Sequence, residues 1–360
     1  MRFRRMRRPA LLSAIMGIAI SAGPAKGADG PGTHIAPFSR TSGKCATCHP
    51  AQANPQPGTS MAHAMETVAE CTILRSHPLL TANANGYSYK IERKGDESIY
   101  SVTNGTQTLT VPIGWAFGLG SAGQTYVFER EGVFYESFVS YYKEPNALDI
   151  TMGDQKLHPS NLTEAAGRLM GDRETVSCFG CHSTSSVAGA KLTLGSLIPG
   201  VQCERCHGPT EHHLEGLKTG NAQLFAMKKL GSMSAEETNE FCGQCHRTWA
   251  QIAMNGPHGV LNVRFQPYRL TNSRCYDVDD QRIKCTSCHD PHREVDKIST
   301  DYDRKCLACH GGGKPGAKAC TVASKGCTSC HMPKIDLPGA HHRFTDHNIR
   351  IVKANGAYPD

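Results

Sequence analysis

This 360-residue sequence has no long apolar run after its N-terminus, little net charge outside residues 1–27 and no cysteine near its N-terminus. Each of these absences argues against one kind of anchor or partner. No stretch beyond the N-terminus approaches 18 apolar residues, so we expect no transmembrane anchor in the mature chain. The formal net charge of +7 falls to about +1 once the six basic residues within 1–27 are set aside, so basicity gives no reason to expect a nucleic-acid partner. The first cysteine is Cys45, too far from the N-terminus to carry a lipid anchor after a leader.

The N-terminus has the pattern of an export signal. Five arginines precede a short apolar stretch at 10–22, and small residues at 25–27 offer a cleavage site. We therefore expect residues 1–27 to be a signal peptide. The mature protein would then be exported, to the periplasm or to the outer surface.

The sequence is rich in cysteine, and the spacing of the cysteines indicates their chemistry. Fourteen of the 17 fall in seven C-x-x-C-H motifs, the sequence that attaches a c-type haem through two thioether bonds and one axial histidine. C-x-x-C also serves zinc sites and thiol redox enzymes, but seven units do not pair evenly into four-ligand zinc sites. We expect seven covalently attached haem c groups. The predicted thioether cysteines are Cys45, Cys48, Cys178, Cys181, Cys203, Cys206, Cys242, Cys245, Cys285, Cys288, Cys306, Cys309, Cys327 and Cys330, and the predicted proximal iron ligands are His49, His182, His207, His246, His289, His310 and His331.

Cys71, Cys275 and Cys320 lie outside the motifs. Their number is odd, which favours one disulfide plus one buried or free thiol, with an axial thiolate as the alternative. The pairing cannot be deduced from the sequence.

Eleven of the 18 histidines remain for a second axial position on seven irons. Bis-histidine ligation at every iron is therefore arithmetically possible, although one open, substrate-binding haem is not excluded. His63 lies among small residues, and Met61 and Met65 are weaker candidates for the same role. The candidate distal ligands are His63, His77, His158, His213, His258, His292 and His347.

The pattern between residues 86 and 142 differs from the rest of the chain. Apolar and polar residues alternate over 87–92, 98–102 and 124–129, and Arg130-Glu-Gly132 has the composition of a hairpin turn into 133–141. We expect a small antiparallel sheet whose tyrosines and phenylalanines form its core. The G-x-G-x-x-G sequence at 118–123 is followed by a strand pattern and not by a helix, so we interpret it as a loop.

Outside that segment we expect a mainly α-helical and irregular multihaem cytochrome c, organised around its haems. A helix is predicted around Leu162–Met170, and a capping box at Ser234–Glu237 predicts another that leads into Cys242. The expected organisation is an N-terminal haem segment at 28–80, a β-rich insertion at 81–150, a multihaem domain at 151–350 and a tail at 351–360.

With these residues in view, the chain resembles the multihaem cytochrome c superfamily of the cytochrome c-552/4 type. The resemblance is carried by Cys203-Glu-Arg-Cys-His-Gly-Pro-Thr-Glu-His-His213, by Cys285-Thr-Ser-Cys-His-Asp-Pro-His292 and by Cys45-Ala-Thr-Cys-His-Pro50. In such proteins the histidine shortly after Cys-His-Gly-Pro commonly ligates a different haem. The resemblance therefore implies that role for His213, with His212 as the near alternative, and by the same logic for His292.

The chain is also similar to multihaem modules that precede tetratricopeptide repeats in some bacterial proteins. This similarity is carried by Gly120-Ser-Ala-Gly-Gln-Thr-Tyr126, Ser140-Tyr-Tyr142, Cys330-His-Met-Pro-Lys334 and Phe344-Thr-Asp-His347. Because the sequence stops soon after His347, we expect no repeat domain. No C-x-x-C-Lys occurs, so the lysine-ligated haem of pentahaem nitrite reductases has no matching motif.

The favoured function is electron transfer through closely packed, mostly bis-histidine haems, with other redox proteins as donor and acceptor. The alternative is an oxidoreductase in which one open haem acts on a small nitrogen or sulfur compound. A structural filament or a sensor is a third interpretation. The sequence does not decide whether the chain is an enzyme, and it does not reveal the oligomeric state.

Overall fold

The structure is a computed structural model that describes residues 42–221, 223, 227, 230–311, 319–353, 356 and 358–359. The expected signal peptide lies outside the described residues. None of the helices within the described ranges is long and apolar enough to cross a membrane.

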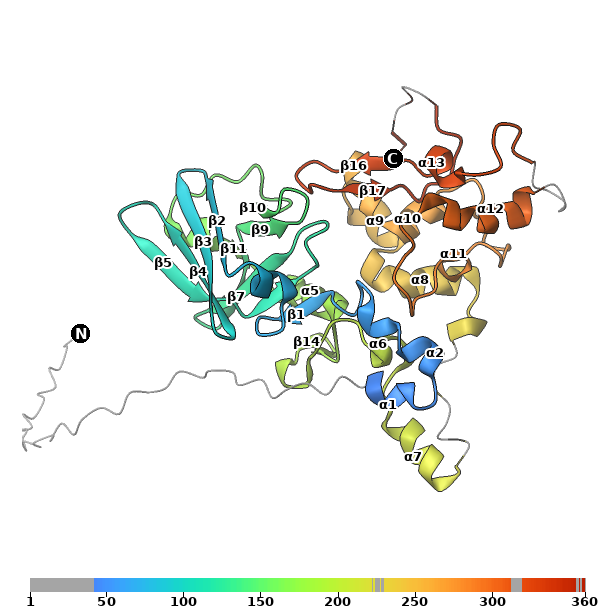
Figure 1. Cartoon of the computed structure of the whole chain (residues 1–360), viewed down its shortest axis with the longest axis horizontal. Helices are drawn as coiled ribbons and strands as arrows, with labels where there is room; N and C mark the ends of the chain where they lie inside the picture. The colour runs from blue at the N-terminus through green and yellow to red at the C-terminus, as the bar shows by residue number, and fades with distance from the viewer. Residues whose placement is uncertain are drawn as a thin grey trace, which may run out of the picture. The chain divides into compact units, whose positions relative to one another are not determined.

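Strands dominate the part of the chain between residues 65 and 169, here called the β-rich part (Figure 1). One antiparallel sheet has the order β2-β3-β4-β5, and a second has the order β1-β6-β7-β8-β11. A separate hairpin pairs β9 with β10. The bounds are β1 Met65–Thr67, β2 Leu79–Ala84, β3 Tyr87–Lys94, β4 Glu97–Thr103, β5 Thr108–Pro112, β6 Trp115–Phe117, β7 Thr125–Arg130, β8 Val133–Ser137, β9 Val139–Tyr142, β10 Ala147–Ile150 and β11 Gly167–Leu169.

The alternating sequence pattern accounts for the core of this part. In β3, Tyr89 and Ile91 are buried while Lys90 between them is exposed, and Tyr100 in β4 is fully buried. Tyr89 and Tyr100 stack with ring centroids 6.4 Å apart. The interpretation of these aromatics as sheet core is thus confirmed, and burial of such large side chains supplies much of the stabilisation.

Two loops in the β-rich part follow the sequence-based expectation. Glu131 and Gly132 connect β7 to β8 with φ angles of 55° and 80°, the left-handed conformation of tight hairpin turns. The segment 118–123 is a loop between the antiparallel strands β6 and β7. It is therefore not the turn from strand to helix that a dinucleotide site requires.

The second sheet extends beyond the range 81–150 at both of its edges. β1 pairs with β6, and β11 pairs with β8. The helix expected around Leu162–Met170 is accordingly shorter: α4 ends at Ala166 and the chain continues as β11. Gly167 packs so closely on the Glu136 carbonyl that a Cβ would clash there. Because glycine has no Cβ, the chain can pair with β8 from this residue onward, where the sequence predicted the end of a helix.

The remaining described chain consists of short helices joined by loops and small hairpins. The capping box of Ser234 and Glu237 is present at the start of α8, as predicted. The hairpins are β12 Ser183–Thr184 with β15 Ile198–Pro199, β13 Val187–Ala188 with β14 Lys191–Leu192, and β16 Lys334–Asp336 with β17 Arg343–Thr345. The helices are α1 Ser42–Ala46, α2 Pro50–Ala53, α3 Thr72–Ser76, α4 Leu162–Ala166, α5 Asp172–His182, α6 Cys203–His207, α7 Glu211–Thr219, α8 Ala235–His246, α9 Trp249–Asn255, α10 Gln266–Thr271, α11 Cys285–Cys288, α12 Asp303–His310 and α13 Cys327–His331.

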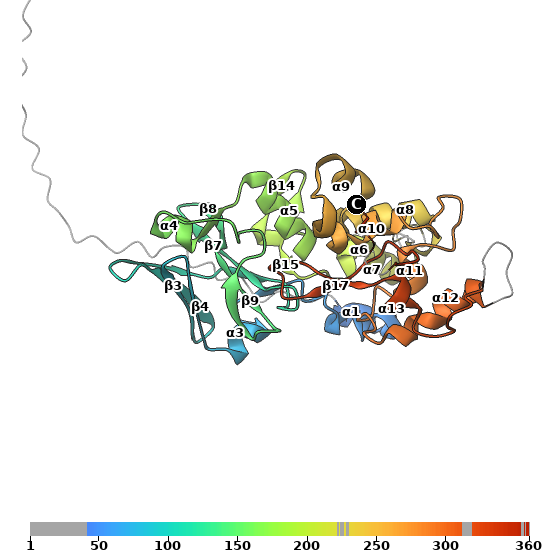
Figure 2. The same ribbon diagram turned by 90° about the horizontal axis from the view of Figure 1, so that it is seen from above.

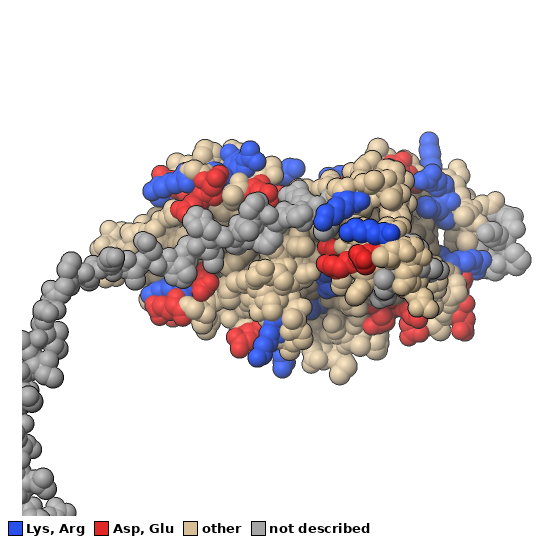
Figure 3. Space-filling model, turned by 90° about the horizontal axis from the view of Figure 1, so that it is seen from below, with Lys and Arg blue, Asp and Glu red and all other residues tan. Residues whose placement is uncertain are grey.

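The surface carries charges of both signs. On the face shown in Figure 3, Lys and Arg side chains lie near Asp and Glu side chains, with uncharged surface between these groups. A mixed surface of this kind agrees with the small net charge that remains without residues 1–27.

Candidate haem-attachment and axial-ligand sites

Each of the seven C-x-x-C-H motifs lies on a single helical turn. Five motifs are contained in α5, α6, α8, α12 and α13. The other two motifs extend beyond the end of the helix in which they begin. There a backbone hydrogen bond completes the turn: the amides of His49 and His289 donate to the carbonyls of Cys45 and Cys285 at 2.8 and 3.0 Å. Residues three and four apart lie on the same face of a helix, so each turn presents both thiols and the imidazole together. The motifs therefore fit covalent attachment of one haem each.

All 17 cysteines lie in described parts of the chain, and none of them forms a disulfide there. The disulfide favoured for the three extra cysteines is thus not found. Cys71 is buried in the β-rich part, where its thiol donates to Oε1 of Gln124 at 3.2 Å. Burial raises the pKa of this thiol to about 12, so it stays protonated at neutral pH. Cys275 is half-buried and Cys320 is exposed.

Three motif histidines face a histidine from another segment. The ring centroids of His49 and His213 are 6.5 Å apart. Those of His207 and His292 are 6.2 Å apart with nearly parallel planes, at 13°. The rings of His289 and His347 are also 6.2 Å apart. Metal–nitrogen bonds of about 2 Å on opposite sides of one ion place two imidazole centres roughly 6 Å apart, so all three pairs have the spacing of an axial pair.

The structure thus brings three of the seven distal candidates against motif histidines. In each pair the candidate lies outside the motif that it faces: His213 follows the third motif and faces the first, and His292 follows the fifth and faces the third. This is the cross-segment arrangement that the resemblance implied. His212, the alternative to His213, is exposed on α7.

Hydrogen bonds fix the orientation of several imidazoles. Nδ1 of His182 lies 2.8 Å from the Ala64 carbonyl, and Nδ1 of His331 lies 2.9 Å from the Arg350 carbonyl. Nδ1 of His347 lies 3.0 Å from the Thr345 carbonyl. A carbonyl accepts only from a protonated Nδ1, which leaves Nε2 with its lone pair as the metal-binding nitrogen. Loss of contact with water also lowers the pKa of the half-buried His347 to about 4, so its neutral form predominates at pH 7.

The other four distal candidates have different surroundings. Nδ1 of His63 lies 2.9 Å from Glu66, and its Nε2 lies 2.9 Å from the Pro57 carbonyl. His77 follows α3 and contacts Tyr141 and Asn146 in the β-rich part. His158 and His258 are exposed in loops. Ligation by these four stays a prediction, as it does for His213, His292 and His347.

Thiols of different motifs lie next to one another. A hydrogen bond between Cys181 and Cys245 raises the pKa of the first thiol and lowers that of the second to about 6. A similar bond joins Cys242 to Cys285, where it lowers the pKa of Cys242 and raises that of Cys285. Thioether formation removes these titrations, but the proximity that causes them remains. It places the second, fourth and fifth motifs in a row.

Further contacts bring the first and third motifs to this row and place the sixth and seventh motifs beside each other. Burial and the neighbouring Cys45 thiol raise the pKa of Cys203 to about 11, which puts the first motif beside the third. Nε of Arg205 in the third motif donates to the Gly180 carbonyl in the second at 3.2 Å. Burial, with Asp303 and Cys306 nearby, raises the pKa of Cys327 to about 12, so the sixth and seventh motifs are also adjacent.

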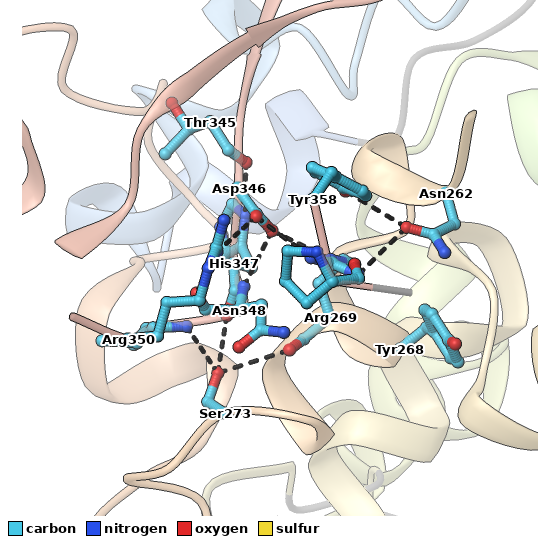
Figure 4. Close-up of polar contacts among 12 residues, drawn as sticks. Asn262, Tyr268, Arg269, Ser273, Thr345, Asp346, His347, Asn348, Arg350 and Tyr358 are labelled. Atoms are coloured by element: carbon cyan, nitrogen blue, oxygen red, sulfur yellow. Dashed lines mark hydrogen bonds and ion pairs between the residues drawn. The ribbon is translucent and has the colours of Figure 1, made fainter. Parts of the chain in front are cut away.

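One polar cluster beside these histidines was not foreseen from the sequence. Arg269 on α10 forms two hydrogen bonds to the carboxylate of Asp346, and both side chains are fully buried (Figure 4). Asp346 directly precedes His347. The only sequence signal was the unusual density of polar and aromatic residues at 262–269, because an ion pair between residues 77 apart leaves no local pattern.

The family described as "Cytochrome c554 and c-prime" matches residues 140–208 of this chain. These residues contain the second and third motifs and end at Gly208, directly after the third. With the motif geometry, this match and the relatives below establish that the chain is a multihaem c-type cytochrome and binds haem c.

Two curated relatives carry the same indication. The chain is 30% identical over 130 residues to the multihaem cytochrome MtrA of Shewanella baltica, and this match covers 34% of the chain and 32% of MtrA. It is 28% identical over 129 residues to the cytochrome c-type protein NrfB of Escherichia coli, and this match covers 34% of the chain and 56% of NrfB. The chain thus matches about a third of one relative and about half of the other. No solved structure matches it significantly.

Proposed function

We propose that this chain is a seven-haem electron-transfer protein in which most irons carry two histidines. The observation that carries the proposal is the placement of His213, His292 and His347 opposite His49, His207 and His289 at 6.2–6.5 Å. Bound haem iron supplies one-electron chemistry, and ligation by two imidazole nitrogens favours transfer over substrate binding because it leaves no coordination position open.

The chain's own residues would hold and orient the groups. Each helical turn fixes two thioether positions and one imidazole, and backbone carbonyls select the tautomer of His182, His331 and His347. The contacts between motifs support the electron-transfer role, since attachment sites on adjacent turns bring their haems close. The order first, third, second, fourth and fifth follows from the contacts through Cys203, Arg205, Cys181 and Cys285.

We further propose that the protein is exported and exchanges electrons with other redox proteins. The N-terminal pattern at 1–27 supports export, and so does the need of c-type haem attachment for a compartment outside the cytoplasm. Mass spectrometry of the secreted holoprotein tests the export and the haem count. We expect a chain that begins near residue 28 and carries seven haems.

The axial ligation is tested with a matched pair of substitutions on α7, made in the holoprotein. His213→Met replaces the imidazole that faces His49, whereas His212→Met changes its exposed neighbour. A thioether ligand raises the reduction potential, so we expect one haem of the His213→Met variant to shift upward by on the order of 100 mV. His212→Met should leave the redox titration unchanged.

Spectroscopy of the unaltered protein distinguishes electron transfer from catalysis. We expect an as-isolated ferric EPR spectrum made of low-spin signals, and no binding of CO after reduction. A stoichiometric high-spin signal together with CO binding would contradict complete bis-histidine ligation and favour the oxidoreductase with one open haem.

A further inference from the structure

The ion pair between Arg269 and Asp346 is unusual because charged side chains are rarely buried completely. Both side chains have zero exposure, and Nε and Nη2 of Arg269 donate to the two carboxylate oxygens at 2.9 and 3.0 Å. Removing two charges from water costs more than such a pair commonly returns, so stability alone is a weak reason for it. A paired arrangement with fixed geometry is better suited to holding the surrounding backbone in one place.

Every nitrogen of the Arg269 guanidinium donates to a specific acceptor. Nη1 of Arg269 donates to Oδ1 of Asn262 at 3.1 Å and to the Pro359 carbonyl at 2.8 Å. The guanidinium carbon lies 4.7 Å from the centre of the Tyr358 ring. Together with the Asp346 carboxylate, these contacts fix Arg269 from three separate segments, as Figure 4 shows.

The carboxylate of Asp346 shapes the segment that follows it. Oδ1 accepts from the Asn348 amide at 3.0 Å, and Oδ2 accepts from Nη1 of Arg350 at 2.6 Å. Ser273 completes the turn: its hydroxyl donates to the His347 carbonyl and accepts from the Ile349 amide, each at 2.8 Å. The backbone of 346–350 is therefore fixed on both sides of His347.

This segment contacts two of the motif histidines. His347 faces His289 of the fifth motif at 6.2 Å. The Arg350 carbonyl lies 2.9 Å from Nδ1 of His331 in the seventh motif, and the Arg350 amide donates to the His331 carbonyl at 3.2 Å. One carboxylate thus supports the positions of histidines that serve two different motifs.

Helix α10 extends the arrangement to the fourth motif. Arg269 lies one turn after Gln266, whose Oε1 is 3.2 Å from Nδ1 of His246. α10 packs against α8, the helix that ends with His246, and Figure 2 shows the two close together. The ion pair joins α10 to the 346–350 segment, so it connects the supports of His246, His331 and His347.

We propose that the Arg269–Asp346 pair is a positioning element for the axial histidines of the fourth, fifth and seventh motifs. It fixes α10 relative to residues 346–350 and so aligns His246, His331 and the His289–His347 pair at once. The inference rests on the proposed axial ligation, because the histidines must bind iron for their alignment to tune it.

The test uses the holoprotein with Arg269→Met and with the double variant Arg269→Met/Asp346→Leu. The single variant removes both Arg269 hydrogen bonds from the buried carboxylate and leaves Arg350 as its charged partner, so we expect both lower thermal stability and loss of low-spin EPR intensity, equivalent to up to three haems. The double variant removes both charges, so its melting temperature should recover. Its low-spin intensity and the potentials of the affected haems should stay perturbed, since no group then holds Asn348 and Arg350.

Two further variants control for general destabilisation. Arg93 is also a largely buried arginine, and it donates to the Val68 and Ala69 carbonyls in the β-rich part. Arg93→Met should lower the melting temperature without changing the haem spectrum. Arg269→Lys keeps the charge but cannot form both hydrogen bonds, so we expect an intermediate spectrum.

The outcomes separate this inference from the function on which it rests. If the double variant recovers wild-type spectrum and potentials together with its stability, the pair is merely structural and the positioning role is overturned. If the Arg269 variants leave the spectrum intact while His347→Met shifts one potential, ligation stands and only the positioning role fails. If His347→Met itself changes no haem signal, the ligand assignment of the fifth motif fails, and the positioning role at that motif fails with it.

Discussion

At the residue scale, the histidines show what composition can and cannot reveal. The sequence identifies each proximal histidine because two cysteines precede it at fixed spacing. The partner of each is a tertiary property: His347 lies far along the chain from His289, and only folding brings their rings to 6.2 Å. Counting histidines could show that enough ligands exist, but it could not assign them.

Asp154 is a buried carboxyl in an unfavourable position. It is 5% exposed, and its Oδ2 has no hydrogen-bond partner within the described residues. The nearest cation is Arg168, 3.9 Å away, which itself pairs with Glu136 and Glu174. Burial and then the negative charge of Glu136 raise the pKa of Asp154 to about 6.

This raised pKa predicts a pH dependence of stability. Between pH 3.8 and about 6 the folded state binds a proton at Asp154 that the unfolded state has lost. The free energy of unfolding therefore falls as the pH rises through this window, and the full penalty applies above it. We expect Asp154→Asn to raise the melting temperature at pH 7.5 by roughly 2–4 °C, equivalent to about 1 kcal/mol, with a smaller gain at pH 4.

Thermal unfolding followed by circular dichroism at both pH values checks this prediction. Asp96→Asn is the control, since Asp96 is 91% exposed and should give no gain at either pH. A benefit of Asp154→Asn that is equal at pH 4 and pH 7.5 would contradict the electrostatic explanation.

At the scale of elements, the strands were more predictable than the helices. The period of two is visible over 87–92 and 98–102 because one face of each strand is buried. Most described helices have four to eight residues, and several of them provide little more than the turn that carries a motif, so they are too short to show a helical period. The edges of the second sheet, β1 and β11, depend on pairing with distant strands and had no local signal.

A close backbone approach joins the segments of the first and third motifs. Gly200 precedes α6 with φ +72°, and a Cβ there would clash with the Ala62 carbonyl. The Val201 amide donates to the Met61 carbonyl at 2.9 Å, and Gln56 donates to the Val201 carbonyl at 2.7 Å. Only glycine allows this contact at position 200.

We expect Gly200→Ala to destabilise the protein more than Gly189→Ala. Both glycines have positive φ, +72° and +62°, but the space around Gly189 is open. The shared backbone strain costs about 1 kcal/mol, whereas the clash at Gly200 adds roughly 1–3 kcal/mol. Thermal unfolding measures the difference, and Gly200→Ala should also change the signal of the haem at His49 and His213. Equal effects of the two substitutions would show that this contact is unimportant.

At the scale of the whole molecule, the described chain has two kinds of core. The β-rich part has its own hydrophobic cluster, which includes Tyr89, Tyr100, Phe128 and Phe138. The largest described cluster of buried apolar residues in the region after residue 230 contains Val263, Leu337 and Ala340. Short helices are not stable alone, so the motif-bearing regions after residue 230 need their covalent haems as core material, whereas Phe179 of the second motif packs against apolar residues of the strands.

This difference predicts how the apoprotein behaves. A leader-free chain expressed where haem is not attached should lose its motif-bearing regions to limited proteolysis, leaving a protected fragment of roughly residues 65–170. The holoprotein, digested in parallel, should resist cleavage throughout its motif-bearing regions. Mass spectrometry identifies the fragment. A protected apoprotein fragment from the C-terminal motifs would show that those regions fold without haem.

The pairing of His49 with His213 has a consequence for how the protein is made. If the chain leaves the cytoplasm N-terminus first, the cysteines of the first motif reach the attachment machinery well before His213 has crossed the membrane. The fifth motif must likewise wait for His347. The haems attached first would then have only one protein ligand for a time. Each would gain its second axial histidine only when a later segment of the chain has crossed the membrane. The order in which segments cross the membrane would thus set the order of assembly, and histidines late in the chain would complete haem sites that began to form much earlier.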